Sequence, residues 1–315
     1  MKTIGVLTSG GDAPGMNACI AAIADCAEKR GALVQGIFRG FAGLLEGNHL
    51  PIGAEIGGLA RRGGSFLGTS RNGDVKRALQ EHGFERLFEA SGIEGLIVLG
   101  GGGSLEAAAR MAEAGARIVG IPCTIDNDVP GTDYCLGFDS AVNRALRSVD
   151  EILDTAESLS DRVFLVETMG GNTGHIALAT AFCAGADAVF IHEQPLDIDR
   201  ASQRIRTKMD SGGTHGLAVI CEDMGTNEIA EKLEAGTGRK VRLTVLGHIQ
   251  RGGNPTFLDR KIARQFGEAA VEMILSGESG KMVTYSCEST RSMPLADTAG
   301  KSREIDLAKY RAVNG

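Results

Sequence analysis

The chain has 315 residues, of which 43% are hydrophobic, 45 are glycine and 7 are proline, and its net charge is −7. This many apolar side chains excludes a disordered chain, and the scarcity of proline excludes a collagen-like one. The negative charge argues against a nucleic-acid binder, which needs a basic surface, but leaves small anionic substrates open because a few local arginines suffice for those.

Short apolar runs alternate with segments of helical periodicity along the chain. Strands are expected at residues 3–7, 33–38, 96–99, 118–121, 163–166, 188–191 and 217–220, and helices at residues 16–30, 105–114, 140–156 and 200–209. Continuous apolar strands that alternate with helices are typical of parallel sheets covered by helices on both faces. The sequence therefore predicts the α/β class, in which ligands bind beyond the carboxyl ends of the strands.

The length of the chain favours two domains. No linker marks a boundary, so we expect direct crossovers near Asp139 and Arg251, which give lobes of residues 1–138 plus 251–300 and 139–250 plus 301–315. The seven cysteines form no CxxC pair, which favours free thiols in a reducing cytoplasm. The longest apolar stretch, residues 176–191, contains Asp187 and is shorter than the roughly 20 residues of a membrane helix. We therefore expect neither a signal peptide nor a membrane span.

Four turns hold many of the glycines. They are residues 8–17, 99–104, 167–174 and 246–255, and the first two lead from a strand into a helix. Glycine lets backbone approach a ligand closely, and a helix N-terminus suits an anion, although tight turns made only for packing are the alternative. Met16 and Asn17 stand where a P-loop needs lysine and serine or threonine, and the spacing of a dinucleotide-binding oxidoreductase is also missing.

Two carboxylates, Asp126 and Asp128, follow the expected strand at 118–121. Alternate residues of an extended segment point the same way, so both can face one cleft. One can take a proton from a hydroxyl while the other helps to hold a metal–phosphate complex, as phosphoryl transfer requires. A turn whose aspartates bond their own backbone is the alternative. Arginines near glycines or strand edges could bind phosphate, and a histidine of the fourth turn is a further ligand candidate; these are Arg71, Arg162, Arg242, Arg251 and His248.

Taken together, these segments resemble the phosphofructokinase A family over nearly the whole chain. The motifs that carry the resemblance are TSGGDAPGMN at 8–17, GGSFLGTSR at 63–71, TIDNDVPGTD at 124–133, MGG at 169–171, Glu222 and VLGHIQRGGNP at 245–255. The resemblance implies two Rossmann-like lobes, the larger binding nucleotide and the smaller binding sugar phosphate. It also implies a cytoplasmic glycolytic homotetramer, or at least a dimer, that transfers a phosphoryl group from Mg-ATP to the 1-hydroxyl of fructose 6-phosphate.

The resemblance also assigns roles to residues. Asp126 would be the general base, and Asp128 would hold Mg²⁺. Residues expected to bind the sugar phosphate are Thr124, Asp128, Met169, Gly170, Glu222, His248 and Arg251 of one chain, with Arg162 and Arg242 reaching the 6-phosphate from a neighbouring subunit. Residues expected to surround the nucleotide are Gly11, Phe41, Arg71, Gly101, Gly103 and Ser104.

Two positions depart from the family pattern. Gly102 replaces an aspartate that serves the magnesium ion, and Gly171 replaces an arginine beside the transferring phosphoryl group. Loss of a transition-state arginine can cost roughly 10³–10⁵ in rate. Two hypotheses therefore stand: an active 6-phosphofructokinase, and a weak or inactive regulatory homologue that binds sugar phosphate.

The phosphoryl donor can also be inferred from the resemblance. Pyrophosphate-using relatives carry aspartate at the position of Gly103 and lysine at that of Cys123, so this chain favours ATP. The basic residues that bind allosteric anions are replaced by Ala21, Asp25 and Asp154. Acidic residues repel anions, so regulation by those effectors is not expected.

Overall fold

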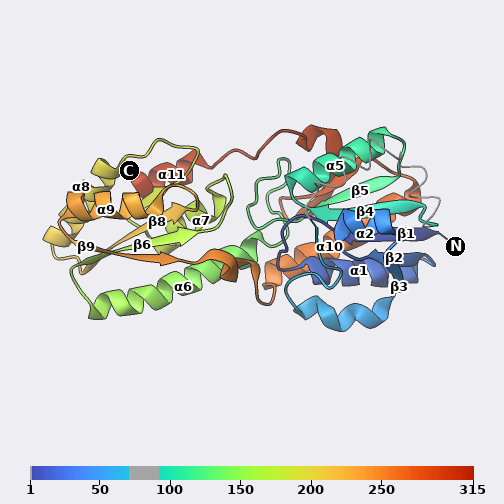
Figure 1. Ribbon diagram of the computed structural model, residues 1–315, viewed down its shortest axis with the longest axis horizontal. Coiled ribbons are helices and arrows are strands. Elements are labelled where there is room, and N and C mark those ends of the chain that lie inside the picture. Colours follow the sequence, from blue (N-terminus) through green and yellow to red (C-terminus); the bar gives the residue numbers. More distant parts are fainter. Residues whose placement is uncertain (1, 71–91) are drawn as a thin grey trace. The chain divides into compact units, whose positions relative to one another are not determined.

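The computed structural model describes residues 2–70 and 92–315. The chain forms two compact units, which are described separately (Figure 1). Unit 1 comprises residues 1–140 and 251–303, and unit 2 comprises residues 141–250 and 304–315. No helix in the described part of the chain is long and apolar enough to span a membrane.

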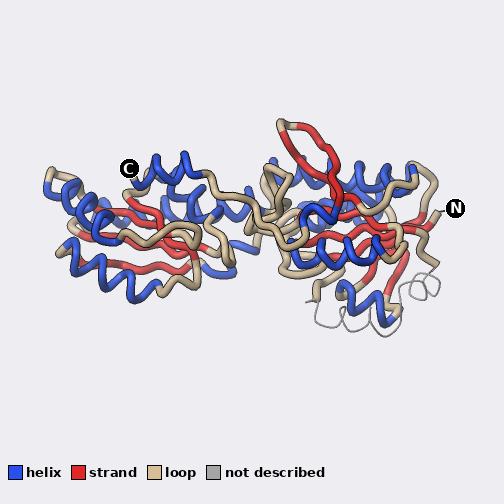
Figure 2. The backbone as a smooth tube through the Cα atoms, turned by 90° about the horizontal axis from the view of Figure 1, so that it is seen from above, coloured by secondary structure: helices blue, strands red, loops and turns tan. Residues whose placement is uncertain are grey.

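In the described residues of unit 1, seven strands form one sheet in the order β11-β10-β5-β4-β1-β2-β3. The strands are β1 (Thr3–Thr8), β2 (Leu33–Ile37), β3 (His49–Ile52), β4 (Gly95–Gly100), β5 (Ile118–Pro122), β10 (Lys281–Ser286) and β11 (Ser289–Pro294). The inner five run parallel, and the edge strands β3 and β11 pair antiparallel. The β10–β11 pair stands out as a hairpin in Figure 2.

Helices cover both faces of this sheet, as the buried apolar strands β4 and β5 require. They are α1 (Met16–Lys29), α2 (Gly40–Glu46), α5 (Gly102–Glu113) and α10 (Phe257–Ser276), with the 3-10 helices η1 (Ala54–Arg61) and η3 (Leu295–Thr298). Leu105 and the alanines of α5 pack with α2 and η3 in one core. Gly267 of α10 allows a close approach to α1, because a methyl group there would lie 2.9 Å from the Ala22 side chain.

Unit 2 holds a four-stranded parallel sheet in the order β7-β8-β6-β9. Its elements are β6 (Arg162–Thr168), β7 (Ala188–Phe190), β8 (His215–Cys221), β9 (Lys240–Val245), α7 (His175–Ala184), α8 (Ile198–Asp210), α9 (Thr226–Thr237) and α11 (Leu307–Asn314). The long helix α6 (Phe138–Ser158) and the short η2 (Gly247–Arg251) continue from one unit into the other. Apolar side chains of α6, α7 and α11 form the core on one face of the sheet, and those of α8 and α9 form the core on the other.

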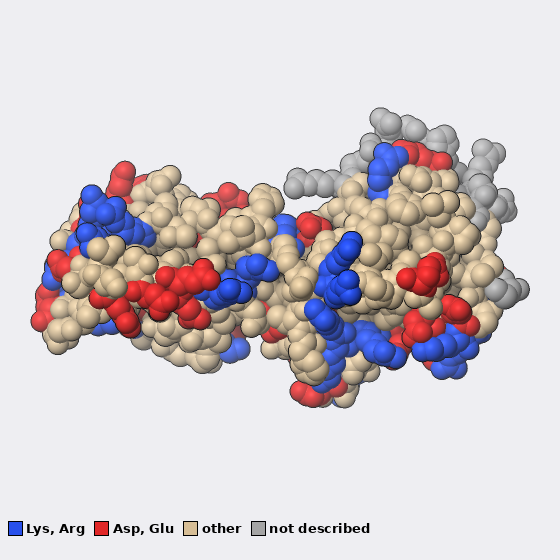
Figure 3. Space-filling view, turned by 90° about the horizontal axis from the view of Figure 1, so that it is seen from below, with Lys and Arg blue, Asp and Glu red and all other residues tan. Residues whose placement is uncertain are grey.

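The predicted α/β class, with parallel sheets covered by helices, is confirmed. All seven cysteines are free thiols, and Cys183 and Cys287 are the exposed ones. On the face drawn in Figure 3, Lys and Arg side chains lie in small groups among Asp and Glu side chains.

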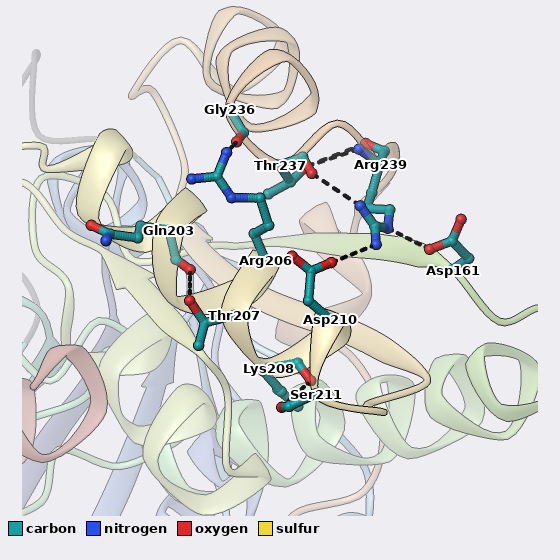
Figure 4. Close-up of polar contacts among 10 residues, drawn as sticks. All are labelled: Asp161, Gln203, Arg206, Thr207, Lys208, Asp210, Ser211, Gly236, Thr237 and Arg239. Carbon is teal, nitrogen blue, oxygen red and sulfur yellow. Dashed lines mark hydrogen bonds and ion pairs between the residues drawn. The ribbon is translucent and has the colours of Figure 1, made fainter.

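Arg239 links the three segments that lead into β6, β8 and β9 of unit 2 (Figure 4). Its guanidinium group donates to Asp161, which precedes β6, and to Asp210 at the end of α8, where the Nη2–Oδ1 distance is 2.9 Å. Arg239 itself lies between α9 and β9. The two aspartates raise the pKa of Arg239. One cation therefore pairs with two carboxylates at the amino end of this sheet.

Candidate active site

In unit 1 the candidate site is built on three neighbouring parallel strands. β5, β4 and β1 lie side by side, so their carboxyl ends meet at one edge of the sheet. The first glycine turn follows β1, the second follows β4, and the TIDND segment follows β5. This edge is where ligands bind in folds of this class.

The turns after these strands approach one another closely. A methyl group on Gly10 would lie 3.5 Å from the Ser104 hydroxyl, and one on Gly101 would lie 3.4 Å from Cβ of Thr124. Ser104 is buried in the first turn of α5, whose N-cap residue is Gly101. No side chain caps this helix, and while the Ser104 amide donates to the Gly101 carbonyl oxygen at 3.0 Å, the amides of Gly102 and Gly103 face the helix N-terminus, where an anion can bind.

Arg251 reaches the first turn from the fourth. Its Nη1 atom donates to the carbonyl oxygen of Asp12 at 3.2 Å, and a methyl group on Gly11 would lie 2.1 Å from the same nitrogen. A side chain at residue 11 would therefore displace the guanidinium group from this position. The two residues bring a bare backbone and a fixed positive charge together.

The TIDND segment forms a turn rather than an extension of β5. Burial nevertheless alternates along it, because Ile125 and Asn127 are buried while Thr124, Asp126 and Asp128 are partly exposed. Asn127 has a φ of 54°. Its side chain anchors the turn, because Oδ1 accepts from the Cys135 amide at 2.7 Å. The Thr124 hydroxyl accepts from the Asp126 amide at 3.2 Å.

Asp128 offers a free oxygen for a cation. Its Oδ1 atom is buried and has no hydrogen-bond partner among the described residues. Burial raises the pKa of this carboxyl above its usual value. Within the described ranges no group of three or more His, Cys, Asp or Glu side chains could hold a metal ion. One carboxylate oxygen fits Mg²⁺, which usually takes one or two carboxylates and completes its shell with phosphate oxygens and water.

The other predicted residues of unit 1 differ in their surroundings. Phe41 is only 1% exposed and lies in the core with Leu7 and Leu44, so it contributes to packing rather than presenting a ring face to a nucleotide. Gly103 is exposed in the first turn of α5. Burial raises the pKa of the Cys123 thiol well above its usual value, so this position carries no charge. Arg71 lies outside the described residues.

In unit 2 a second cluster forms at the carboxyl ends of β6 and β8. Glu222 Oε1 accepts hydrogen bonds from the amides of Gly170 at 2.9 Å and Gly171 at 2.7 Å. Both glycines have positive φ, 154° and 58°. The Met169 amide donates to Oε1 of Gln250 at 2.7 Å. Met169, Gly170 and Glu222 are therefore brought together, whereas His248 lies exposed in η2.

Gln250 is a residue that the sequence did not single out. Its side chain is 0% exposed, and apart from its place in the glycine-rich fourth turn nothing marks an uncharged glutamine as an anchor. Its contact with the Met169 amide couples the fourth turn to the third.

Arg162 and Arg242 lie away from that cluster within one chain. Arg162 is the first residue of β6 and Met169 follows the last, so at about 3.3 Å per residue they are roughly 20 Å apart. Arg242 pairs in register with Phe164, two residues along β6 from Arg162. The two arginines therefore share a face of the sheet near its amino end, because registered partners point the same way.

The comparisons with known proteins agree with this architecture. The family model described as "Phosphofructokinase" matches residues 3–274. A relative from Lysinibacillus sphaericus, named "ATP-dependent 6-phosphofructokinase", is 43% identical over 98% of this chain and 98% of its own length. A relative of the same name from Halalkalibacterium halodurans is 41% identical over 99% of this chain and 98% of its own length.

A solved structure supports the same grouping. The phosphofructokinase of Pichia pastoris in the T-state superposes with a TM-score of 0.88 at 30% identity, covering 94% of this chain. This chain spans 35% of the length of that yeast chain. The family match covers well over half of the sequence. This chain belongs to the phosphofructokinase family.

Proposed function

We propose that this chain is an ATP-dependent 6-phosphofructokinase, which transfers the terminal phosphoryl group of ATP to the 1-hydroxyl of fructose 6-phosphate. One observation carries the proposal: Asp126 and Asp128 follow β5 at the edge of the sheet where Gly10, Gly101 and Arg251 also meet. Relatives that bear this enzyme name over 98% or more of the chain support it.

In this proposal each residue of unit 1 acts on one part of the reaction. Asp126 accepts the proton of the 1-hydroxyl as that oxygen attacks phosphorus. The Thr124 hydroxyl holds the Asp126 backbone in place. Arg251, Ser104 and the amides of Gly11, Gly101 and Gly103 bind anionic oxygens, and such fixed donors lower the barrier because they need no reorganisation. On unit 2, Met169, Gly170, Glu222 and His248 bind the sugar.

Asp128 is proposed to hold Mg²⁺ through its unpartnered Oδ1 atom. Mg²⁺, when bound, neutralises charge on the phosphate oxygens. Burial removes water from the Asp128 carboxylate and so raises its pKa. A bound cation would replace that lost hydration and stabilise the ionised form.

Gly102 and Gly171 are compatible with either an active enzyme or a weak or inactive regulatory homologue. The relatives favour the active enzyme, since both bacterial relatives bear the name of an enzyme. The uncharged Cys123 and Gly103 support ATP over pyrophosphate as donor. We further propose that residues 1–138 plus 251–300 form the nucleotide lobe and that residues 139–250 plus 301–315 form the sugar-phosphate lobe. A cytoplasmic homo-oligomer, a tetramer or a dimer, is part of the same proposal, because Arg162 and Arg242 would serve a neighbouring copy.

A coupled assay of fructose 1,6-bisphosphate formation tests the proposal. The purified chain is given fructose 6-phosphate and Mg²⁺ with ATP, with pyrophosphate, or with no donor. Turnover with ATP and none above background with pyrophosphate is expected. Turnover with pyrophosphate alone would overturn the choice of donor, and no turnover with either would overturn the proposed activity.

A further inference from the structure

The Arg239 cluster of Figure 4 bears directly on Arg162. Asp161, the residue before Arg162, gives its carboxylate to Arg239, which also pairs with Asp210. The Arg239 side chain is only 24% exposed, whereas Asp161 and Asp210 are 72% and 57% exposed. The better-buried arginine is therefore the fixed member, and the two aspartates are held against it.

The backbone of Asp161 needs such support. Its φ is 66°, a left-handed conformation that is disfavoured for most residues with a Cβ atom, although aspartate adopts it more readily than most. The Asp161 amide donates to the carbonyl oxygen of Thr214 at 2.8 Å, so two contacts hold this residue at the start of β6. The direction in which Arg162 leaves the backbone depends on that conformation.

Arg162 is not neutralised by any nearby acid. Among the residues described in the structure, no carboxylate lies within ion-pair distance of it, and its buried Nε atom has no hydrogen-bond partner. The contact of its Nη1 atom is a 3.4 Å hydrogen bond to the Ser160 carbonyl oxygen. Asp161 is the acid nearest in sequence, and Arg239 occupies it. Arg162 thus keeps its positive charge for an anionic ligand.

We propose that Arg239 is a positioning residue for fructose 6-phosphate binding. It withholds the Asp161 carboxylate from Arg162 and fixes the strained Asp161 backbone, so that Arg162, beside Arg242 on the same face, is available to the 6-phosphate. The inference rests on the proposed function, in which Arg162 binds the substrate of a neighbouring copy. It assigns no contact between Arg239 and the substrate.

A double-mutant cycle on the full chain tests this inference. The variants are Arg239→Gln, Arg162→Gln and the double variant, and the readout is the KM for fructose 6-phosphate. Arg239→Gln should raise this KM about tenfold, with kcat changed less than about twofold and the KM for ATP unchanged. In the Arg162→Gln background the same change should have little further effect, because residues that act as one unit are not additive. Additive effects of the two changes would overturn the inference.

Two further variants separate positioning from folding. Asp161→Gly removes the carboxylate and tolerates the left-handed backbone, so it should fold, leave the KM near the wild-type value and suppress the rise caused by Arg239→Gln. If Arg239→Gln alone does not fold, Arg239→Lys, which lacks the planar fork that holds both aspartates, replaces it in the cycle. Lys208→Gln is the matched control, because it breaks the 2.8 Å ion pair with Asp187 in the same unit and should leave the KM unchanged. An equal rise in the KM for Lys208→Gln would point to general loosening and contradict the inference.

Calorimetric binding of fructose 6-phosphate keeps the two proposals apart. If the wild type binds the sugar phosphate without turnover, the proposed activity fails. The double-mutant cycle can then still be carried out with the Kd for fructose 6-phosphate as its readout. If turnover is normal and Arg239→Gln leaves both KM and Kd unchanged, the activity stands and the positioning role fails. If the wild type neither binds nor turns over, both are overturned.

Discussion

The Asp259 carboxylate in α10 accepts hydrogen bonds from the Ser140 hydroxyl, with an Oγ–Oδ2 distance of 2.6 Å, and from the Ser140 amide, with an N–Oδ2 distance of 2.8 Å. These bonds join the start of α6 to the start of α10. The other carboxylate oxygen accepts from the Gly137 amide at 2.8 Å. Asp259 is fully buried, and burial raises its pKa from 3.8 to about 6 despite these donors.

This raised pKa predicts a pH dependence of stability. Between pH 4 and pH 6 the unfolded chain loses the proton of this carboxyl before the folded chain does, so the free energy of unfolding falls as pH rises through that range. A shift of about two units corresponds to about 3 kcal/mol. Urea unfolding should be measured for the wild type and Asp259→Asn. Between pH 4 and pH 7 the free energy of unfolding of the wild type should fall by about this amount relative to that of the variant.

Ser140→Ala gives the control for this prediction. The Ser140 hydroxyl lowers the pKa of Asp259. Its removal should therefore extend to higher pH the range over which the free energy of unfolding falls. Parallel stability profiles for all three proteins would show that Asp259 does not titrate in this range.

Gly102→Asp should raise activity with little effect on stability. A Cβ atom at Gly102 meets no atom within 4 Å, so the side chain has room. An aspartate in the first turn of α5 also lies favourably at a helix N-terminus. We expect kcat to rise about tenfold and half-maximal activity to need less Mg²⁺, because a second carboxylate supports the ion. Magnesium titrations of the kinase assay measure this, and Gly102→Ala, which fills the space without charge, should behave like the wild type.

Gly171→Arg should show opposing effects on stability and rate. Gly171 has a φ of 58°, so any side chain there should cost about 1 kcal/mol of folding free energy. The guanidinium group of the new arginine would add positive charge that stabilises the phosphoryl group in the transition state, so kcat should rise. Thermal unfolding and steady-state rates of Gly171→Ala, compared with those of Gly171→Arg, separate the effect on stability from the effect on rate. Alanine introduces the backbone strain without the charge. A gain in kcat with alanine alone would refute the charge argument.

Gln250→Leu should weaken both unit 2 and sugar-phosphate binding. It leaves the Met169 amide without its acceptor, and an unpaired buried amide costs about 1–3 kcal/mol. The KM for fructose 6-phosphate should rise because the turn that carries Met169 and Gly170 loses a support. Gln203→Leu on the exposed side of α8 is the control and should alter neither quantity.

The sequence predicted the inner strands β1, β4 and β5 because their apolar character is continuous. β1, β4 and β5 are buried on both faces, so every residue contributes to the pattern. The edge strands β3, β9 and β11 were not predicted, because edge positions are half exposed and mix polar with apolar residues. The inner strand β10 was also missed, since lysine, threonine and serine interrupt its apolar run although its middle is buried. The start of α10 does carry a local signal, since the Thr256 side chain caps the helix by accepting from the Asp259 amide.

For the candidate site, local sequence singled out residues that directly follow a strand and missed contacts between residues that lie far apart along the chain. Asp126 and Asp128 follow a strand, which suffices to place them at the sheet edge. Arg239 and Asp161 are separated by 78 residues, so no local pattern joins them. The core position of Phe41 also depends on packing from other elements rather than on its neighbours in sequence.

The most direct test of the account is the rate of phosphoryl transfer in Asp126→Asn. With ATP, Mg²⁺ and fructose 6-phosphate, the wild type should turn over, and the variant should lose roughly 10²–10⁴ in kcat because the proton of the 1-hydroxyl has no acceptor. Calorimetry should show fructose 6-phosphate binding to both proteins with a similar Kd. A variant as active as the wild type, or a wild type without turnover, would contradict the account.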